Sequence, residues 1–179
     1  MFRAAGVLES GRGGSMDLTL IPRKGFEGQY NGRLTGKKIR IRGAPAMADL
    51  LGAISGVGLL EQLNGKGIVF ADYQVQFRLT PRQVIITSGS AVGPSMGVSM
   101  DGVYNLGAGT MDMQGVFSPI YFLNGIGQVF TRKGEGLFGF NYRMTGKAAD
   151  PKVRVNPLSV LTPGMFRELF KRSPPKVAE

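Results

Sequence analysis

Hydrophobic and polar residues alternate along most of this chain with the two-residue period of β-strands that expose one face. The alternation is longest over residues 67–80, where every second side chain from 69 to 79 is apolar and Asp, Gln and Arg stand among the rest. Similar stretches occupy residues 16–21, 30–42, 83–87, 96–104, 111–117, 138–144 and 152–155. Because turns separate most of them and strands and helices do not alternate repeatedly, the pattern predicts a mainly β protein, an antiparallel meander forming a curved sheet or groove.

Three segments depart from this period. Over residues 44–63 apolar side chains recur every three or four positions, which predicts one internal helix. Its glycines, including the pair Gly52 and Gly56, favour close packing on a sheet over a membrane interface, because polar residues interrupt the segment. Residues 118–133 are apolar and predict a short helix or a loop.

The third segment lies near the C-terminus. Thr162 and Pro163 are typical of a helix cap and first turn, so we expect an amphipathic helix to follow. We expect one domain over residues 1–172 and a disordered tail over 173–179.

Composition removes most enzyme chemistry. The chain has no Cys, His or Trp, which excludes disulfides, Cys/His zinc sites, thiol nucleophiles and imidazole-based triads. Asp101 and Asp112 flank a predicted hairpin, but a third ligand or base is missing, so the pair is a weak metal or acid–base candidate. We therefore expect no enzymatic activity, no metal and no cofactor. The 28 glycines and 10 prolines indicate frequent turns.

A formal net charge of +10 predicts anionic partners. Lys38, Arg40 and Arg42 alternate with two isoleucines, and this stripe either contacts phosphate or is the solvated face of a strand. We expect no nucleic acid, because no recognition motif occurs and the aromatic residues stand at core-facing positions; a basic nucleic-acid binder is the third hypothesis.

Contact with a membrane surface fits the charge better. The C-terminal helix combines large apolar side chains with basic ones, and its candidate membrane-contact residues are Met165, Phe166, Arg167, Leu169, Phe170, Lys171 and Arg172. The same helix would also be explained by docking on the sheet. A stripe of four methionines, at positions 96, 100, 111 and 113, is either an adaptable apolar surface or ordinary core.

Five segments resemble one family of proteins. They are SAVGPSMG (90–97), MDMQGV (111–116), GEGLF (134–138), YRMTG (142–146) and DPKVRVNPLS (150–159). In this order they resemble the C-terminal region of AsmA-like envelope proteins, with the YhdP-like branch nearest, and the resemblance covers nearly the whole chain. The AGVLES beginning at residue 5 is typical of mid-protein sequence, so we expect either the C-terminal piece of a longer chain or a truncated relative.

The resemblance implies a non-catalytic module that carries phospholipid between the inner and outer membranes of a Gram-negative cell, along a curved sheet with an apolar face. It implies the periplasmic side of the envelope, with an inner-membrane anchor elsewhere in full-length relatives. We expect the acyl-chain groove to be lined by Val69, Tyr73, Val75, Phe77, Phe138, Phe140 and Tyr142. The alternative is an assembly factor that binds outer-membrane proteins by β-augmentation. Partners would thus be phospholipid, a membrane surface, and either the N-terminal remainder of the protein or outer-membrane proteins.

Overall fold

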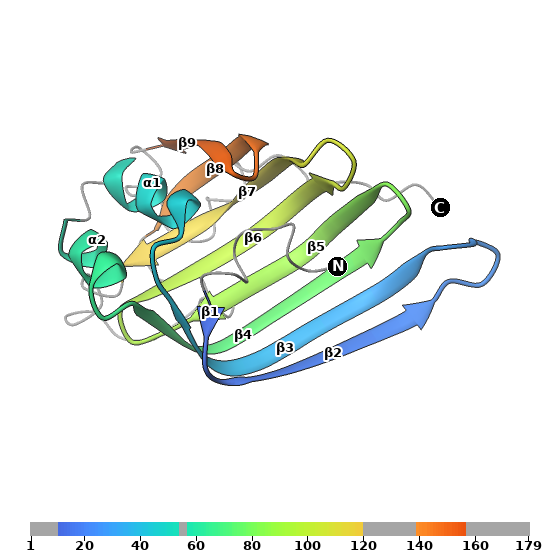
Figure 1. The fold of residues 1–179 in the computed structure, drawn as a ribbon, viewed down its shortest axis with the longest axis horizontal. Helices are drawn as coiled ribbons and strands as arrows, with labels where there is room; N and C mark the ends of the chain where they lie inside the picture. The colour runs from blue at the N-terminus through green and yellow to red at the C-terminus, as the bar shows by residue number, and fades with distance from the viewer. Residues whose placement is uncertain (1–10, 54–56, 120–138, 157–179) are drawn as a thin grey trace.

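The computed structural model describes residues 11–53, 57–119 and 139–156. Within these ranges nine strands form one antiparallel sheet in the order β1-β3-β4-β5-β6-β7-β8-β9, with β2 also paired to β3 (Figure 1). The strands are β1 Gly11–Arg12, β2 Ser15–Pro22, β3 Tyr30–Ile41, β4 Ile68–Leu79, β5 Gln83–Val92, β6 Met96–Asn105, β7 Thr110–Pro119, β8 Phe140–Lys147 and β9 Asp150–Asn156. Two short helices, α1 Pro45–Ala53 and α2 Val57–Asn64, join β3 to β4.

The predicted fold class is confirmed, since the molecule is mainly β and its strands form an antiparallel meander in an open curved sheet. The helix predicted over 44–63 is described as two helices, one on each side of residues 54–56. The strand predicted at 83–87 continues to Val92. Of the segment 118–133, residues 118 and 119 end β7. The remainder of that segment, the C-terminal helix and the tail lie outside the described residues.

The two helices lie over one end of the sheet (Figure 1). α2 contacts β4, α1 contacts β9, and the helices contact each other. Strands in a sheet are about 4.8 Å apart, so β4 and β9 would be about 24 Å apart if the sheet were flat. A pair of helices this short contacts both strands because the sheet curves around them.

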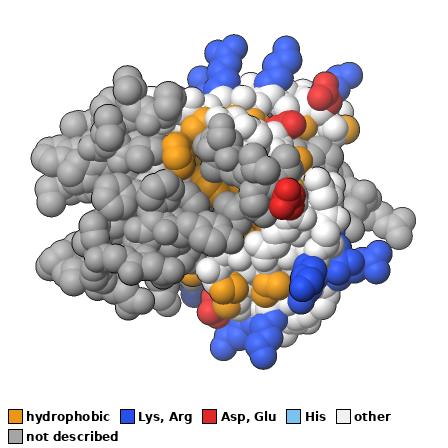
Figure 2. All heavy atoms as spheres, turned by 90° about the vertical axis from the view of Figure 1, so that its left-hand side faces the viewer, with side chains coloured by type: hydrophobic (Ala, Val, Ile, Leu, Met, Phe, Trp, Pro, Cys, Tyr) orange, Lys and Arg blue, Asp and Glu red, His pale blue; other side chains and the backbone are white. Residues whose placement is uncertain are grey.

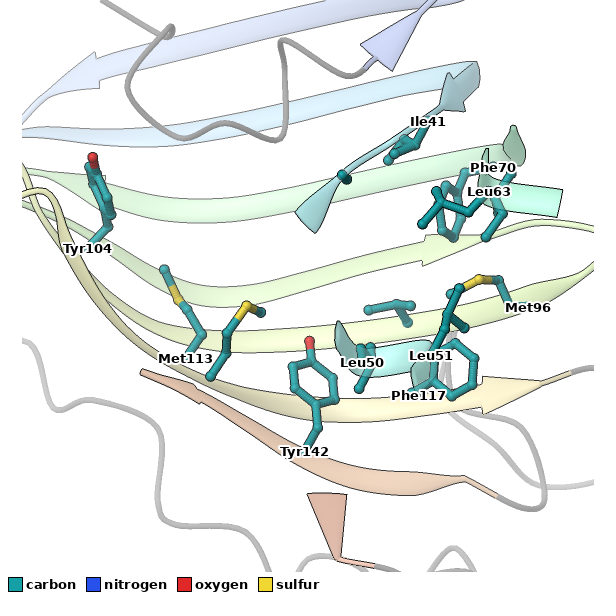
Figure 3. Close-up of a cluster of buried hydrophobic side chains, with 14 residues drawn as sticks. Ile41, Leu50, Leu51, Leu63, Phe70, Met96, Tyr104, Met113, Phe117 and Tyr142 are labelled. Atoms are coloured by element: carbon teal, nitrogen blue, oxygen red, sulfur yellow. The ribbon is translucent and has the colours of Figure 1, made fainter. Parts of the chain in front are cut away.

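The core lies between the helices and the sheet. Leu50 and Leu51 of α1 and Leu63 of α2 are buried, and they belong to one cluster with side chains from the strands. Figure 3 shows these leucines beside Phe70, Met96, Phe117 and Tyr142, and shows Met113 and Tyr104 farther along the sheet. The helices therefore cover only part of the sheet surface on which the cluster lies.

The first strands change direction near Lys38. The Lys38 backbone has a φ of 58°. Gly13 and Gly14, which connect β1 to β2, also have positive φ values. On β4 beside this point, Phe70 is buried in the core, whereas Ala71 and Asp72 are both exposed. Two successive outward residues interrupt the alternation, so Phe70 and Tyr73 point to the same side of the sheet.

Candidate functional site

One face of the sheet is apolar across its whole width. Because directly paired residues share a face, the strand register defines transverse rows. Three successive rows are Met16, Gly36, Tyr73, Ala91, Val98, Phe117 and Phe140; Leu18, Leu34, Val75, Gly89, Met100, Gly115, Tyr142 and Val155; and Leu20, Gly32, Phe77, Ile86, Gly102, Met113, Met144 and Val153. We call this surface the apolar face.

The opposite face is mostly polar. It carries, among others, Asp17, Arg33, Gln74, Gln76, Ser90, Asp101, Asp112, Gln114, Arg143 and Arg154. In Figure 2, viewed from the side where the helices lie, hydrophobic side chains gather in the middle of the molecule and Lys and Arg side chains project at its periphery. The sheet is therefore amphipathic.

Large side chains on the apolar face lie against glycines of the neighbouring strand. A Cβ atom placed on Gly32 would overlap the ring of Phe77, and one on Gly36 would overlap the ring of Tyr73. The same arrangement recurs where Tyr142 meets Gly115, with its Oη only 2.9 Å from the position of such a Cβ. Glycine inside a strand lets a large neighbour lie flat across it, which stabilises the strand pair.

Two tyrosines bridge three strands each in this way. The Tyr73 hydroxyl donates to the Ser15 carbonyl oxygen at 3.1 Å, passing over β3 to reach the start of β2. The Tyr142 hydroxyl donates to the Ser99 carbonyl oxygen at 3.0 Å, passing over β7 to reach β6. Burial, with a smaller effect of Asp101, raises the pKa of Tyr142 well above its usual range. Burial and Asp17 likewise raise the pKa of Tyr73, so both side chains stay neutral.

The apolar face divides into a covered and an open part. The covered part, on β6 to β8, includes Met96, Phe117 and Tyr142, which belong to the core cluster. The open part, on β2 to β4, stays outside that cluster: Met16, Leu18 and Leu20 are 54%, 38% and 40% exposed, and Leu34, Tyr73, Val75 and Leu79 are half-buried. We call these seven residues the open apolar strip.

The open apolar strip continues to the tip of the β2–β3 hairpin. Pro22, Phe26 and Tyr30 line a hollow of about 420 Å³ there, and the Arg23 guanidinium lies 4.0 Å from the centre of the Phe26 ring. From Met16 to Pro22 the strand rises by about 20 Å. The strip is therefore long and narrow, which suits an extended apolar ligand better than a compact one.

The structure places most predicted groove residues on the apolar face but divides them between its parts. Tyr73 and Val75 belong to the open apolar strip, and Phe77 is buried against Gly32. Tyr142 lies in the covered part, as a member of the core cluster. The half-buried Phe140 packs against that cluster. Val69 lies apart, because its strand neighbour Phe70 points into the core.

Some predicted residues are not placed, and some placed residues were not predicted. Phe138 and the membrane-contact candidates of 165–172 lie outside the described residues. Met16, Leu18 and Leu20 of β2 were not among the groove candidates, although the alternation over 16–21 already put these three on one face. Of the four methionines, Met96 and Met113 are buried in the core and the other two are half-buried on the same face.

The polar face offers no reactive constellation among the described residues. Asp112 accepts two hydrogen bonds from Arg143, at 3.0 and 3.1 Å, and this pair raises the pKa of the guanidinium. Asp101 accepts from the Gln114 amide at 2.9 Å. No group of three or more acidic side chains that could hold a metal occurs in the described part of the chain. No described helix is long and apolar enough to cross a membrane.

No protein-family model, curated protein or solved structure matches this chain. The resemblance to AsmA-like envelope proteins therefore stays a prediction, carried by the five segments quoted above.

Proposed function

We propose that this protein is a non-catalytic lipid-binding or lipid-transfer module that holds phospholipid acyl chains against the apolar face. The observation that carries the proposal is the open apolar strip, on which seven apolar side chains are exposed or half-buried while the other face of the same strands is polar. Contiguous exposed apolar surface of this kind marks a binding site. The Tyr73 hydroxyl within the strip already donates to the Ser15 carbonyl oxygen, so an alkyl chain placed there would not leave this hydroxyl unsatisfied.

The dimensions fit an acyl chain. One leaflet is half of a hydrocarbon core that is about 30 Å thick, so a lipid chain is about 15 Å long when it crosses its leaflet. The strip, at about 20 Å, accommodates that length. Each methylene removed from water contributes about 0.8 kcal/mol, and a chain in contact over half its surface would gain several kcal/mol.

The cellular setting is part of the same proposal. The segments that resemble AsmA-like proteins imply transfer of phospholipid between the two membranes of a Gram-negative envelope, on the periplasmic side. An open, curved and amphipathic sheet is the kind of surface that this role requires. We propose that the chain acts there as one part of a lipid conduit.

Neighbouring residues on β4 provide a matched test. Val75 belongs to the open apolar strip, and Gln76 lies on the polar face of the same strand. The protein would be purified in mild detergent, exchanged out of it and examined by native mass spectrometry with lipid extraction. Val75→Glu loses about two methylenes of contact and adds a charge, so bound phospholipid should fall at least about tenfold.

Gln76→Glu introduces the same carboxylate on the other face and should keep the bound lipid. Lipid-free wild-type protein that is folded and monomeric would refute the proposal, and so would equal lipid occupancy in the two variants.

A second function is favoured by the edge of the sheet. Among the described strands β2 pairs only with β3, and all eight of its residues are exposed. It carries no Lys, and its Pro22 stands only at its end, so Asp17 is the one charged residue that protects this edge strand. An assembly factor that pairs β2 with a strand of an outer-membrane protein would use this edge. A photocrosslinker at Thr19 that captured an identified barrel protein, from cells whose purified product holds no lipid, would favour it.

A further inference from the structure

Five basic side chains gather where β3 ends and β4 begins. Lys37, Lys38, Arg40 and Arg42 come from β3 and the residue after it, and Lys66 precedes β4; all five are exposed. We call this group the basic corner. It lies at the Met16 end of the open apolar strip but on the other side of the sheet, because Lys37 and its partner Ser15 alternate with Gly36 and Met16 of the apolar face.

The two arginines are held in place by one carbonyl group. Arg40 Nη1 donates to the Lys66 carbonyl oxygen at 2.7 Å, and Arg42 Nε donates to the same oxygen at 3.2 Å. Gly67 permits this approach, because a Cβ atom there would lie 2.7 Å from Arg42 Cγ and 2.9 Å from Arg40 Cγ. A guanidinium has five N–H donors, so each arginine keeps most of its donors for an anion.

The backbone of Lys38 has an unusual conformation that its surroundings must stabilise. Its φ of 58° is in the left-handed region, which lysine adopts at a cost, and it is the one non-glycine residue with positive φ in the part of the chain that the structure describes. Sparsely populated backbone conformations cluster at functional sites. Lys38 is exposed, as are Lys37 and Arg40.

The corner keeps its positive charge. Asp72, directly opposite Lys37 on β4, is the carboxylate that the register brings to it. No ion pair within 4.0 Å is found for the five cations among the described residues, whereas Arg143 on the polar face is neutralised by Asp112. Five exposed cations with one facing carboxylate, and with no ion pair in the described ranges, concentrate positive charge that attracts anionic surfaces.

We propose that the basic corner docks the protein on an anionic phospholipid bilayer. The choice of a bilayer rests on the proposed lipid-binding function. It is also favoured over nucleic acid because isoleucines, and no base-stacking aromatics, alternate with Lys38, Arg40 and Arg42. Phosphate groups of the lipid surface meet the two fixed guanidinium groups, and the lysines add long-range attraction.

Vesicle flotation tests this proposal on the full chain. Wild type should bind vesicles of phosphatidylcholine that contain about 30% phosphatidylglycerol, because each basic group near an anionic surface contributes about 1 kcal/mol. It should bind pure phosphatidylcholine far less, and inorganic phosphate at the same charge concentration should not release it. Arg40→Glu with Arg42→Glu should weaken binding at least about thirtyfold, as expected for two lost basic contacts.

The control is Lys152→Glu with Arg154→Glu, which makes the same charge change on exposed residues of β9. Lys38→Gly with Lys66→Glu is a second test that keeps the Lys66 carbonyl and relieves the left-handed backbone, so it should fold; it should also weaken vesicle binding. Equal losses in corner and control variants would overturn the proposal, as would unchanged binding in the corner variants, or tighter binding to duplex DNA than to anionic vesicles.

The two proposals fail separately. Corner-dependent vesicle binding by a protein that holds no lipid would keep the docking surface and refute lipid carriage. Bound lipid in a protein without vesicle affinity would keep lipid carriage and refute the docking surface.

Discussion

The contact between Gly32 and Phe77 gives the sharpest test of how the apolar face is built. A Cβ atom on Gly32 would overlap the Phe77 ring, and that ring is only 8% exposed, so it can move aside only by losing packing. Overpacking of this kind costs about 1–3 kcal/mol, which we expect for Gly32→Ala. Removing the ring with Phe77→Ala should cost about 3 kcal/mol, at the low end for a buried phenylalanine, because Phe77 lies outside the main core cluster.

The double variant decides the matter. Without the ring there is nothing for the new methyl group to strike, so Gly32→Ala with Phe77→Ala should be about as stable as Phe77→Ala alone. The coupling free energy should then be about 1–3 kcal/mol, measured by urea unfolding followed by circular dichroism. Additivity of the two single changes within about 0.5 kcal/mol would refute the flat packing of Phe77 on Gly32. Gly52→Ala is the control, because a Cβ atom on this exposed α1 residue has no neighbour within 4 Å; it should stabilise the protein by up to about 1 kcal/mol.

Three further predictions concern single residues. Lys38→Gly should raise the free energy of unfolding by about 1 kcal/mol, because glycine adopts a φ of 58° without strain; a loss of stability in urea titration would contradict this. Tyr142→Phe should cost about 1 kcal/mol at pH 7 by removing the hydrogen bond to Ser99. The raised pKa keeps Tyr142 protonated in the folded state at pH values where unfolded tyrosines ionise, near pH 10. The free energy of unfolding of the wild type should therefore fall above about pH 10, and that of Tyr142→Phe should fall less. Parallel curves of stability against pH would contradict the burial of this hydroxyl. Arg143→Ala should cost less than about 1 kcal/mol and the loss should shrink in high salt, since its pair with Asp112 is exposed; a larger, salt-independent loss would mean that the pair is not a surface interaction.

The sequence alone determined the strands and the sides to which most of their residues point. Alternation over 67–80 was enough to separate Val75 and Phe77 from Gln74 and Gln76, because a strand side chain has only two sides available. The absence of His and Cys likewise decided which chemistries were excluded before any fold was known.

Glycine was harder to interpret, because its role depends on its neighbours across the sheet. Its abundance indicated turns, and turns such as that at Gly109 contain it. Yet Gly32, Gly36 and Gly115 lie inside strands, opposite the aromatic side chains that cover them. The signal was available as glycine at apolar positions of an alternating strand, but the partner of each glycine is set by the register, which one sequence does not state.

The tertiary structure decided where the alternation changes side and where the apolar face is open. Val69 follows the same sequence period as Tyr73, but the left-handed turn at Lys38 and the matching irregularity at Ala71 and Asp72 put Phe70 in the core instead. A two-residue period is the same for a closed core and an open groove. Curvature of the sheet around α1 and α2 separates them, because these helices contact β4 and β9 at one end and leave the side chains of β2 outside the core.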